Sequence, residues 1–354
     1  MKIGLIVPAN LKYAPYVQYY LKVLDASHVE YKLMVWNKVG INEDVACVLN
    51  YSSVDSNRKK IFIGHILFAG KCKQYIKKEK IDHMIIFTIA PLFFLGENFL
   101  RRFNNKMIID IRDDSPFRSR FSDKLKRICS LAKSVVVSSN NYSPWTGRET
   151  VLCHNVDVDL LKKYVDLPIK KVQDIPHEIV FAGTMNEADI NISILKILGN
   201  SKLFSFGFVG NRNEGKKIVE KFVSENQYMN VWFEGTYKKE DIVNKYREKA
   251  ELINIFRANT IINRNALPNK LYDAVVSAVP VVVFRHNEAI VNYVEKYNLG
   301  IILDDLEPSL IEDSLINGIE KFDYSLFQKG RAEFLDKVLD DQRSFEEMLQ
   351  TFIS

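Results

Sequence analysis

Short runs of apolar residues alternate along the chain with longer segments in which apolar positions recur at helical spacing. Such alternation is typical of repeated strand–helix–strand units, and therefore of mostly parallel sheets covered by helices. In the first half, strands are predicted over 3–7, 31–35, 61–63, 84–88, 107–111, 134–138 and 150–153, and helices over 13–26, 66–80 and 121–132. We expect these segments to form one open α/β domain.

A polar joint follows this first alternating region. Residues 166–177 contain Pro168, a lysine pair and Pro176, and they show neither helical nor strand periodicity. The alternation then resumes, with strands predicted over 178–181, 203–209, 230–233, 252–255, 279–284 and 300–303. The pattern thus predicts two parallel-sheet domains. Because open parallel sheets bind ligands beyond the carboxyl ends of their strands, the expected site is a cleft between the domains.

The size and composition are those of a folded chain with more than one domain. Its 354 residues exceed what one compact core usually holds, and its 15 glycines and 10 prolines exclude collagen-like and low-complexity chains. Cys47, Cys72, Cys129 and Cys153 have no Cys-x-x-Cys spacing, which indicates neither a disulfide framework nor a structural zinc site. The apolar run at 1–8 is too short for a signal peptide, and no apolar stretch is long enough to span a membrane. We expect a cytoplasmic protein.

Charge is unevenly distributed along the chain. Residues 1–170 hold 27 Lys and Arg against 16 Asp and Glu, whereas residues 171–354 hold 22 against 28. A basic first half indicates an anionic partner, such as phospholipid headgroups, nucleic acid or a phosphorylated substrate. A lysine surplus from biased codon usage is the alternative. Nucleic acid is not expected as a partner, because no recognised binding motif accompanies the charge.

Aromatic and basic residues adjoin one another in segment 90–103, where an apolar stretch precedes Arg101 and Arg102. Further cations occur on two predicted helices: Lys71, Lys73, Lys77, Lys78 and Lys80 on one, and Arg118, Arg120, Lys124, Lys126 and Arg127 on the other. Basic and aromatic surfaces of this kind can lie on anionic membranes. The sequence therefore predicts peripheral attachment of the basic N-terminal domain to the inner face of the cell membrane. Helices with a solvated outer face are the alternative.

The most informative segment is 263–283, Asn-Arg-Asn-Ala-Leu-Pro-Asn-Lys-Leu-Tyr-Asp-Ala-Val-Val-Ser-Ala-Val-Pro-Val-Val-Val. A helix is expected to begin near Pro268, because proline is favoured at the first helical position, and a buried strand should follow the helix. Free amide groups at that helix start, beside Arg264 and Lys270, suit a diphosphate. Asp273 follows Lys270 by three residues, so both lie on nearly the same face, where the carboxylate can accept hydrogen bonds from ribose hydroxyls.

This segment resembles the C-terminal domain of GT-B glycosyltransferases, in particular the retaining enzymes of glycosyltransferase family four. The family signature has two glutamates separated by seven residues, followed by a turn of small residues and Pro-Val. Aligning that ending with 278–281 places Asp273 at the second glutamate and Asn265 at the first, while Ala278 stands where the family usually has glycine. The resemblance implies donor-binding roles for Asn265, Asn269, Lys270 and Asp273.

Other segments follow in the order that the same family has. Segment 179–185 resembles the first strand and phosphate-side loop of the donor domain, with Gly183 and Thr184 where the backbone approaches the donor. Segment 230–236 resembles the strand and loop beside the nucleotide base, and its glycine is Gly235. The usual arginine and lysine pair after the first of these loops is absent. The cations expected to replace it are Arg212, Arg264 and Lys270.

In the first half, segment 107–116 resembles the family strand that ends in a charged turn. It places Arg112 and Asp113 where the family often has a His-Asp or Arg-Asp pair near the reacting sugar. An internal ion-pair turn formed by Asp110, Arg112 and Asp113 is the alternative. Segment 151–157, with His154, resembles the last strand of the N-terminal domain. A retaining enzyme of this type needs no dedicated base, because the leaving phosphate assists attack on the same face, whereas an inverting enzyme would use Asp113 or His154. The resemblance implies that no metal is bound.

The fold expected from these resemblances is α/β of the GT-B type, with two Rossmann-like parallel-sheet domains facing across a cleft. Residues 1–170 would bind the acceptor, residues 171–335 would bind the nucleotide-sugar donor, and residues 336–354 would form a terminal helix that returns to the first domain. The implied activity is that of a hexosyltransferase in bacterial surface polysaccharide or capsule synthesis. It would move a sugar from a nucleotide-diphosphate sugar, with UDP the expected nucleotide, to a hydroxyl of a glycan carried on polyprenyl diphosphate.

Two alternatives from other functional classes stay open. A nucleotide-sugar epimerase can share the same two-domain fold, and would turn over donor without acceptor. A catalytically silent relative, acting as scaffold or partner subunit, is suggested by the departures from the family signature at Asn265 and Ala278.

Overall fold

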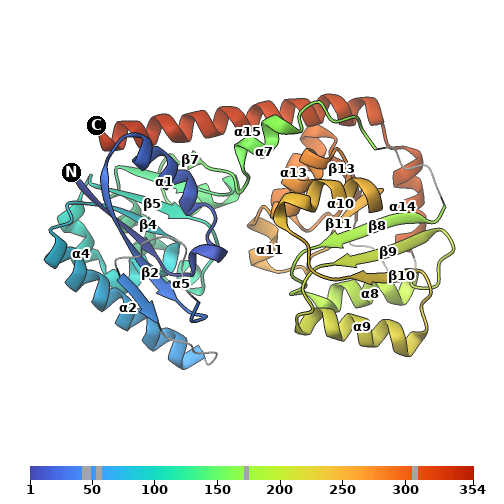
Figure 1. Cartoon of the computed structure of the whole chain (residues 1–354), viewed down its shortest axis with the longest axis horizontal. Coiled ribbons are helices and arrows are strands. Elements are labelled where there is room, and N and C mark those ends of the chain that lie inside the picture. The colour runs from blue at the N-terminus through green and yellow to red at the C-terminus, as the bar shows by residue number, and fades with distance from the viewer. Residues whose placement is uncertain (42–48, 53–57, 171–174, 305–309) are drawn as a thin grey trace. The chain divides into compact units, whose positions relative to one another are not determined.

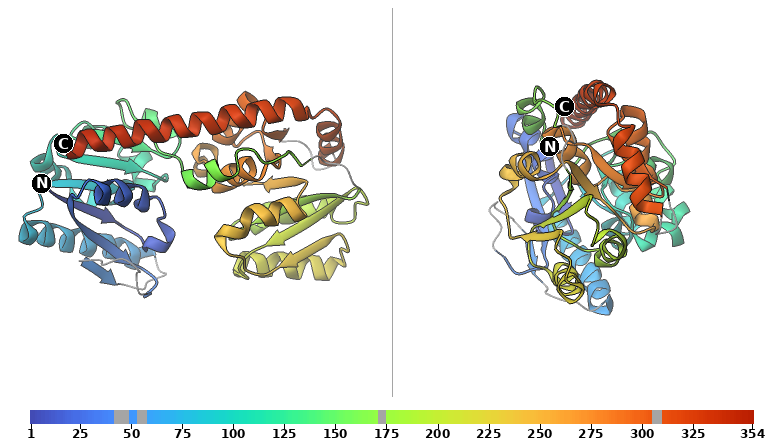
Figure 2. Two further views of the ribbon diagram at one scale, coloured as in Figure 1. Left: turned by 45° about the horizontal axis from the view of Figure 1, so that its top comes forward. Right: turned by 90° about the vertical axis from the view of Figure 1, so that its right-hand side faces the viewer.

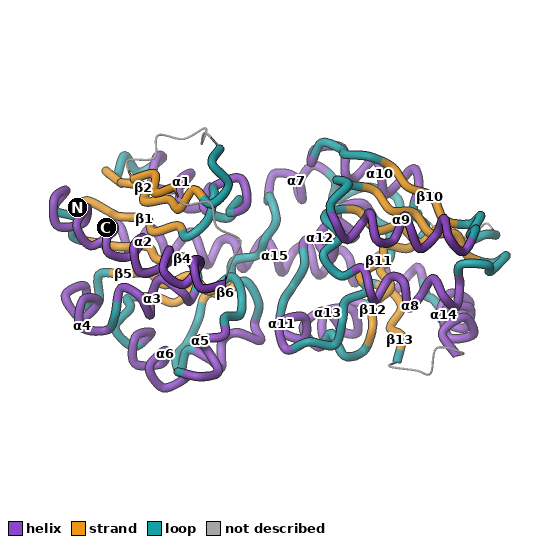
Figure 3. Tube along the Cα trace, turned by 90° about the horizontal axis from the view of Figure 1, so that it is seen from below, coloured by secondary structure: helices purple, strands orange, loops and turns teal. Residues whose placement is uncertain are grey.

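The computed structural model describes residues 1–41, 49–52, 58–170, 175–304 and 310–354, and it divides them into two compact units. Unit 1 comprises Met1–Asn155 and Asp340–Ser354, and unit 2 comprises Val156–Leu339. Figures 1 and 3 show that the strands of each unit lie between helices. The prediction of two parallel-sheet, Rossmann-like domains is confirmed.

Unit 1 is built on a seven-stranded sheet whose order is β3-β2-β1-β4-β5-β6-β7. Every neighbouring pair in it is parallel. The strands are β1 (Lys2–Val7), β2 (Glu30–Asn37), β3 (Leu49–Ser52), β4 (His83–Phe87), β5 (Met107–Ile111), β6 (Ser134–Val137) and β7 (Val151–Leu152). The central strands are buried on both faces, which is why they appear in the sequence as continuous apolar runs.

Within Met1–Asn155, the helices of unit 1 are α1 (Val17–Ala26), α2 (Arg58–Glu79), α3 (Ile89–Leu95), α4 (Glu97–Leu100), α5 (Pro116–Arg120) and α6 (Ser122–Cys129). The strand predicted over 61–63 is wrong, because these residues lie in the first turns of α2. In this helix Phe68, Cys72 and Ile76 are buried at intervals of four residues, and Ala69 is buried beside Phe68. The helical period over the whole segment thus outweighs a local run of β-branched and aromatic residues. The edge strand at this place is β3, which is only half-buried.

Unit 2 contains a six-stranded sheet, again with every neighbouring pair parallel, in the order β10-β9-β8-β11-β12-β13. The strands are β8 (His177–Ala182), β9 (Phe204–Val209), β10 (Val231–Glu234), β11 (Leu252–Ile255), β12 (Val281–Phe284) and β13 (Gly300–Leu303). The helices are α7 (Val158–Lys163), α8 (Ala188–Leu198), α9 (Glu214–Asn226), α10 (Ile242–Lys249), α11 (Ile261–Asn265), α12 (Asn269–Ser277), α13 (Glu288–Tyr297) and α14 (Ile311–Glu320). All six strands predicted for this half are confirmed.

Two hydrophobic cores cover the two faces of the unit 2 sheet. One face packs against apolar side chains of α10, α12 and α13, and the other against those of α8, α9 and α14. Strand β11 shows the alternation directly, because Ile253 and Ile255 belong to the first core and Leu252 to the second. The sheet is therefore held rigidly at its centre, and its strand ends are left to carry loops.

A helix of 30 residues, α15 (Tyr324–Ile353), ends the chain. Figure 2 shows it as one continuous helix up to the C-terminus. Its first part belongs to unit 2, and its residues from Asp340 onward belong to unit 1. Phe345, Leu349 and Phe352 are buried in the core of unit 1 beside α1, and the ring of Phe345 meets Tyr20 edge-on at 4.9 Å.

Within the described ranges, no helix combines the length and the apolar composition that a membrane span requires. Cys72, Cys129 and Cys153 are buried free thiols, while Cys47 lies outside the described residues. Burial raises the pKa of the Cys153 thiol to about 11 and that of Cys129 to about 12, so neither is a thiolate at neutral pH.

Candidate functional site

Two glycine turns end adjacent strands of unit 2. Gly183 follows β8 with φ +131°, and Gly210 follows β9 with φ +143°, a region that side chains rarely adopt. A Cβ on Gly210 would overlap the carbonyl oxygen of Gly183, so the two turns can approach only because residue 210 carries no side chain. The amide of Gly183 donates to the carbonyl of Val209 at 2.9 Å, which ties the turns together.

Helix α12 starts beside these turns, near the position that the sequence predicts. Pro268 is its N-cap residue in extended conformation, and Asn269 is its first helical residue. The helix ends at Ala278, which is buried and left-handed, with φ 53°. Glycine avoids the steric cost of that conformation, so the alanine here is accommodated at a position that favours glycine.

Lys270 extends from the first turn of α12 toward β8. Its ammonium lies 4.1 Å from the centre of the Phe181 ring, and about 3.5 Å from the position that a Cβ on Gly183 would occupy. Burial is the main cause that lowers the pKa of Lys270 to about 8; Arg257 acts in the same direction, and Asp273 and Glu187 act in the opposite one. Lys270 is thus mainly charged at neutral pH, but poorly solvated.

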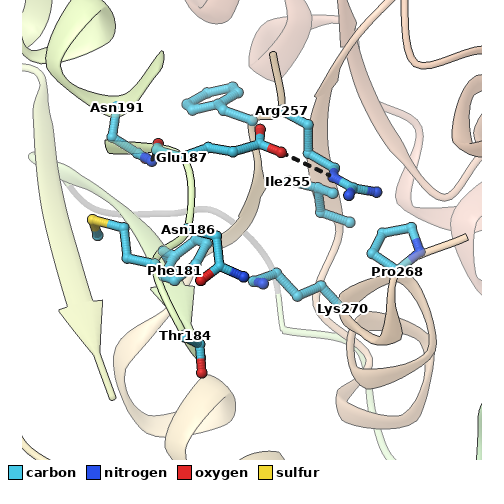
Figure 4. A pocket seen from close by; sticks show the side chains of 11 residues that line it. Phe181, Thr184, Asn186, Glu187, Asn191, Ile255, Arg257, Pro268 and Lys270 are labelled. Carbon is cyan, nitrogen blue, oxygen red and sulfur yellow. Dashed lines mark hydrogen bonds and ion pairs between the residues drawn. The ribbon is translucent and has the colours of Figure 1, made fainter. Parts of the chain in front are cut away.

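These groups border a cavity of about 140 Å³ at the carboxyl ends of β8 and β11. Figure 4 shows the side chains that line it, among them Lys270 and Arg257 on one side and Thr184, Asn186 and Glu187 around the loop after β8. The remaining lining residues are Phe181, Met185, Asn191, Ile255, Phe256 and Pro268. Two cations and one carboxylate give the cavity a net positive charge, which suits an anionic ligand.

Arg257 and Glu187 were not predicted from the sequence. The Glu187 carboxylate accepts from the amide of Ala258 at 2.7 Å and from the Asn263 side chain at 2.8 Å, and its oxygen lies 4.0 Å from Nε of Arg257. His286 Nε2 lies 2.7 Å from the backbone oxygen of Arg257. The signal that could have found Arg257 is its place directly after the buried strand β11, since ligand-binding residues follow such strands.

Asp273 lies one turn along α12 from Lys270 and is half-buried. The charge of Asp273 acts on two tyrosines of unit 2. Burial, with a smaller contribution from Asp273, raises the pKa of Tyr237 to about 12. Asp273 also contributes to the raised pKa of the buried Tyr246. The carboxylate therefore does not face bulk solvent alone. It lies outside the residues that line the 140 Å³ cavity.

The other donor-side residues predicted from the sequence are dispersed. Thr184 lines the cavity, whereas Gly235 and Asn269 are exposed and do not line it. Arg212 is exposed and pairs with Glu220 at 2.7 Å. Arg264 donates to Asn259 at 2.8 Å, and Asn265 donates to the backbone oxygen of Ile261 at 2.7 Å. The structure thus brings Gly183, Thr184 and Lys270 together, and Arg257 takes the second cationic position.

In unit 1, Arg112 forms a buried ion pair with Asp110 at 2.6 Å. Its other terminal nitrogen donates to the carbonyl of Cys153 at 2.9 Å and to Asn155 at 3.1 Å. The hydroxyl of Tyr20 donates to the same Asp110 oxygen at 2.7 Å. These contacts hold Arg112 inside the unit.

His154 and Asp113 lie in different environments. His154 is buried, with Nε2 3.0 Å from the carboxylate of Asp341 on α15. Asp113 is exposed, and it lines a second cavity, of about 300 Å³, within unit 1. Of the three residues predicted to be catalytic, Asp113 borders this cavity, whereas Arg112 and His154 are buried and do not line it.

No group of three His, Cys, Asp or Glu side chains in the described residues is placed to hold a metal ion. Asp157 and Asp159 have Asp-x-Asp spacing, but the Asp157 carboxylate accepts from the Asp159 amide and thereby caps α7.

No protein-family model matches the chain, and no curated protein matches its sequence. Solved structures do match it over nearly its whole length. Sucrose-phosphate synthase from Thermosynechococcus elongatus has a TM-score of 0.70 at 13% identity, over 99% of this chain and 98% of that one. The lipopolysaccharide outer core galactosyltransferase WaaB has a TM-score of 0.67 at 13% identity, over 99% of both chains.

An enzyme of another class has the same architecture. UDP-N-acetylglucosamine 2-epimerase from Rickettsia bellii has a TM-score of 0.65 at 11% identity, over 100% of this chain and 97% of that one. Identities this low show the fold alone, since one fold carries many activities. The fold is GT-B, as the sequence predicts.

Proposed function

We propose that this protein is a glycosyltransferase that binds a nucleotide-diphosphate sugar in unit 2 and transfers the sugar to a hydroxyl of an acceptor bound by unit 1. The observation that carries the proposal is the cavity at the carboxyl ends of β8 and β11, in which Lys270 and Arg257 present two cations next to the glycine turn at Gly183. A diphosphate needs close backbone approach and positive charge, and this place offers both.

The same groups provide the chemistry. As the bond between sugar and diphosphate breaks, negative charge develops on the leaving phosphate. Lys270 and Arg257 stabilise that charge, and because burial has already removed much of the water around Lys270, little solvent has to reorganise. Asp273 is the residue proposed to accept hydrogen bonds from the ribose, by its place in the family signature. UDP is the proposed nucleotide.

Retention of configuration is the proposed stereochemical course. In this mechanism the leaving phosphate assists the attack of the acceptor hydroxyl on the same face of the sugar, and no protein base is needed. An inverting reaction would require a base, and Asp113, exposed at the cavity of unit 1, is better placed for that role than His154, which is buried and paired with Asp341.

The proposed acceptor is a glycan carried on polyprenyl diphosphate, as in bacterial surface polysaccharide synthesis, and the proposed location is the inner face of the cell membrane. Support comes from an aromatic cluster on unit 1, in which rings from α2, α3, α5 and the start of α6 are in contact: Phe62, Phe94, Phe117, Phe93 and Phe121. Lys124 lies 5.6 Å from the Phe93 ring and Arg120 lies 5.7 Å from the Phe121 ring. Cations beside partly exposed aromatic rings suit anionic lipid headgroups.

The experiment that tests the main proposal is titration of the purified protein with UDP and GDP, followed by incubation with a panel of UDP-sugars. Binding of UDP is expected, and it should be weaker in Lys270→Met. A chain that binds neither nucleotide would be a silent GT-B relative, and the proposal would fail.

An epimerase is the second candidate, because UDP-N-acetylglucosamine 2-epimerases share the fold. The two candidates differ in their need for an acceptor. A transferase releases UDP from the donor only when the acceptor is present, apart from slow hydrolysis, whereas an epimerase converts UDP-N-acetylglucosamine to its epimer without any acceptor. Proton NMR of the donor in the absence of acceptor separates them.

A further inference from the structure

The cavity of about 300 Å³ in unit 1 lies where the direction of strand order reverses. Its walls include Ala9 after β1, Lys38 after β2, Thr88 after β4 and Asp113 after β5. In the sheet, β1 lies between β2 and β4, so the chain builds outward in both directions from this point. Such a switch point is where an open parallel sheet receives its ligand.

Lys38 contributes a positive charge to this cavity. The side chain is half-buried, and burial lowers the pKa of its ammonium. The ammonium lies over the face of the Trp36 ring, 4.4 Å from its centre, and no carboxylate of the described residues lies within ion-pair distance of it. A partly desolvated cation without a counter-ion is costly unless a ligand supplies the negative charge.

The backbone around Lys38 is held in place by a buried network. The side chain of Asn10 donates to the Asn37 side chain at 2.7 Å, and its oxygen accepts from the amides of Lys38 at 2.9 Å and Val39 at 3.3 Å. Asn37 also donates to the backbone oxygen of Ile41 at 2.6 Å. The loop is thereby clamped to the end of β1, so the lysine is presented by a pre-organised backbone.

His65 adds a neutral hydrogen-bonding group. Its ring stacks on Phe94 at 5.0 Å and meets Trp36 edge-on at 4.7 Å, and none of the described residues hydrogen-bonds its ring nitrogens. Burial, reinforced by Lys38, lowers the pKa of His65 to about 4. The imidazole is thus uncharged at neutral pH, and one ring nitrogen can donate a hydrogen bond into the cavity.

The backbone of Thr88 is strained at this place. Its φ is 66° with ψ 168°, a conformation that a β-branched residue rarely adopts, and it persists because the Thr88 amide donates to the carbonyl of Asp110 at 2.7 Å. Strain of this kind is typical of ligand sites, where it orients a particular side chain. Here the residue that it orients lines the cavity.

We propose that this cavity binds an acceptor that carries a phosphate group, with Lys38 as the counter-ion of the phosphate and His65 as a hydrogen-bond donor to it. This inference rests on the proposed transferase function and specifies its acceptor. A phosphate at Lys38 would hold the acceptor in the same cavity that Asp113 borders.

The phosphate can belong to a lipid or to a soluble sugar phosphate. Helix α2 favours the lipid, because Phe62 and Ile66 share the His65 side of the helix and are exposed by 49% and 48%. An apolar chain attached to the phosphate can lie on these residues, whereas a sugar phosphate gains nothing from them.

The test uses calorimetric titration of the full chain with three probes, each alone: inorganic phosphate, glucose 6-phosphate and farnesyl phosphate. Binding of at least one organic phosphate is expected, with affinity lowered at least tenfold in Lys38→Ala and largely restored in Lys38→Arg. Lys133→Ala removes an exposed lysine that does not line the cavity, and should change nothing. Tighter binding of farnesyl phosphate assigns the lipid source, and tighter binding of glucose 6-phosphate assigns the soluble one.

The inference is overturned when none of the three probes binds at millimolar concentration, or when Lys38→Ala and Lys133→Ala weaken binding equally. UDP affinity, measured on the same samples, separates this failure from that of the proposed function. UDP binding without phosphate binding leaves the transferase proposal in place and removes only the phosphate-bearing acceptor. A midpoint temperature of thermal unfolding equal to that of the wild type shows that Lys38→Ala is folded.

Discussion

The ammonium of Lys270 lies over the ring of Phe181, 4.1 Å from its centre, at the end of β8 where the glycine turn begins. The aromatic face partly compensates a cation that has lost much of its water, and it keeps the ammonium directed into the cavity. The relationship joins residues from two elements, α12 and β8, and makes Lys270 the centre of the proposed donor site.

Replacing Lys270 with methionine should weaken UDP binding by roughly 10- to 100-fold, because a hydrogen bond to a charged group contributes about 1.5–3 kcal/mol. Methionine keeps the apolar stem in contact with Phe181, so the fold should not suffer. Isothermal titration calorimetry measures the effect. Lys202→Met, at an exposed lysine outside the cavity, is the matched control. Equal losses in both variants would remove Lys270 from the site.

The affinity for UDP should fall as pH rises through about 8. The pKa of Lys270 is lowered to about 8 by burial, so the free protein loses this charge above that pH, while bound diphosphate favours the protonated form. The decline approaches tenfold per pH unit between the pKa values of the free and bound forms. Titrations from pH 7 to 9.5 measure it, a range in which the nucleotide's own phosphate is already ionised. Lys270→Arg should flatten the profile.

The stability effect of the same group has the opposite direction. The folded protein releases the Lys270 proton at lower pH than the unfolded chain, whose value is near 10.5, so unfolding takes up a proton between these two values. The contribution of Lys270 to stability therefore rises with pH across that window. Wild type and Lys270→Met should converge in urea unfolding as pH increases from 8 to 10.5, and parallel curves would contradict the lowered pKa.

Removing the Arg112 side chain should lower the free energy of unfolding of unit 1, and not only the rate of the reaction. In Arg112→Met the carboxylate of Asp110 stays fully buried without its cation, which costs about 3–5 kcal/mol. Urea unfolding measures this loss. The double variant Asp110→Asn, Arg112→Met should regain much of it, because no buried charge is left alone. A stable but inactive Arg112→Met would instead point to a direct catalytic role.

Asp113→Asn distinguishes the two stereochemical courses. A retaining mechanism needs no base, so kcat should change by no more than about threefold. A base at this position would make the same change cost about 10²- to 10⁴-fold. Steady-state kinetics with a UDP-sugar and acceptor gives the answer, and Asp123→Asn, at another exposed carboxylate of unit 1, controls for charge.

Truncating Phe345 should show that the end of α15 is part of the core of unit 1. Its ring is fully buried against Tyr20, so Phe345→Ala should cost about 3–5 kcal/mol. Glu347→Ala, on the exposed side of the same helix, should cost less than about 0.5 kcal/mol. Similar losses in both variants would show that the helix is not anchored through this residue.

Much of the fold could be predicted from apolar periodicity. The strands β1, β4 and β5 are buried on both faces, so their sequences are continuous apolar runs that only a parallel sheet explains. The exception is instructive: Ile61, Phe62 and Ile63 resemble a strand locally, yet they begin a helix whose buried positions lie further along. The true edge strand β3 is half-buried, so its sequence has no comparable apolar signal.

The resemblance pointed to Gly183 and Thr184, and the predicted helix start to Lys270. The structure places these three residues close together, because a turn after a strand and the first turn of a helix are local features. Arg257 and Glu187 could not be found from the sequence, because their pairing joins loops 70 residues apart. An internal ion pair was one of two interpretations of the charged turn at 110–113, but the turn by itself did not decide that Arg112 points inward to Asp110 while Asp113 lines a cavity. Local backbone preferences and side-chain periodicity depend on neighbouring residues and can therefore be predicted from the sequence. The direction of a side chain and the solvation of its charge depend on which distant segments pack around it, so only the tertiary structure decides them.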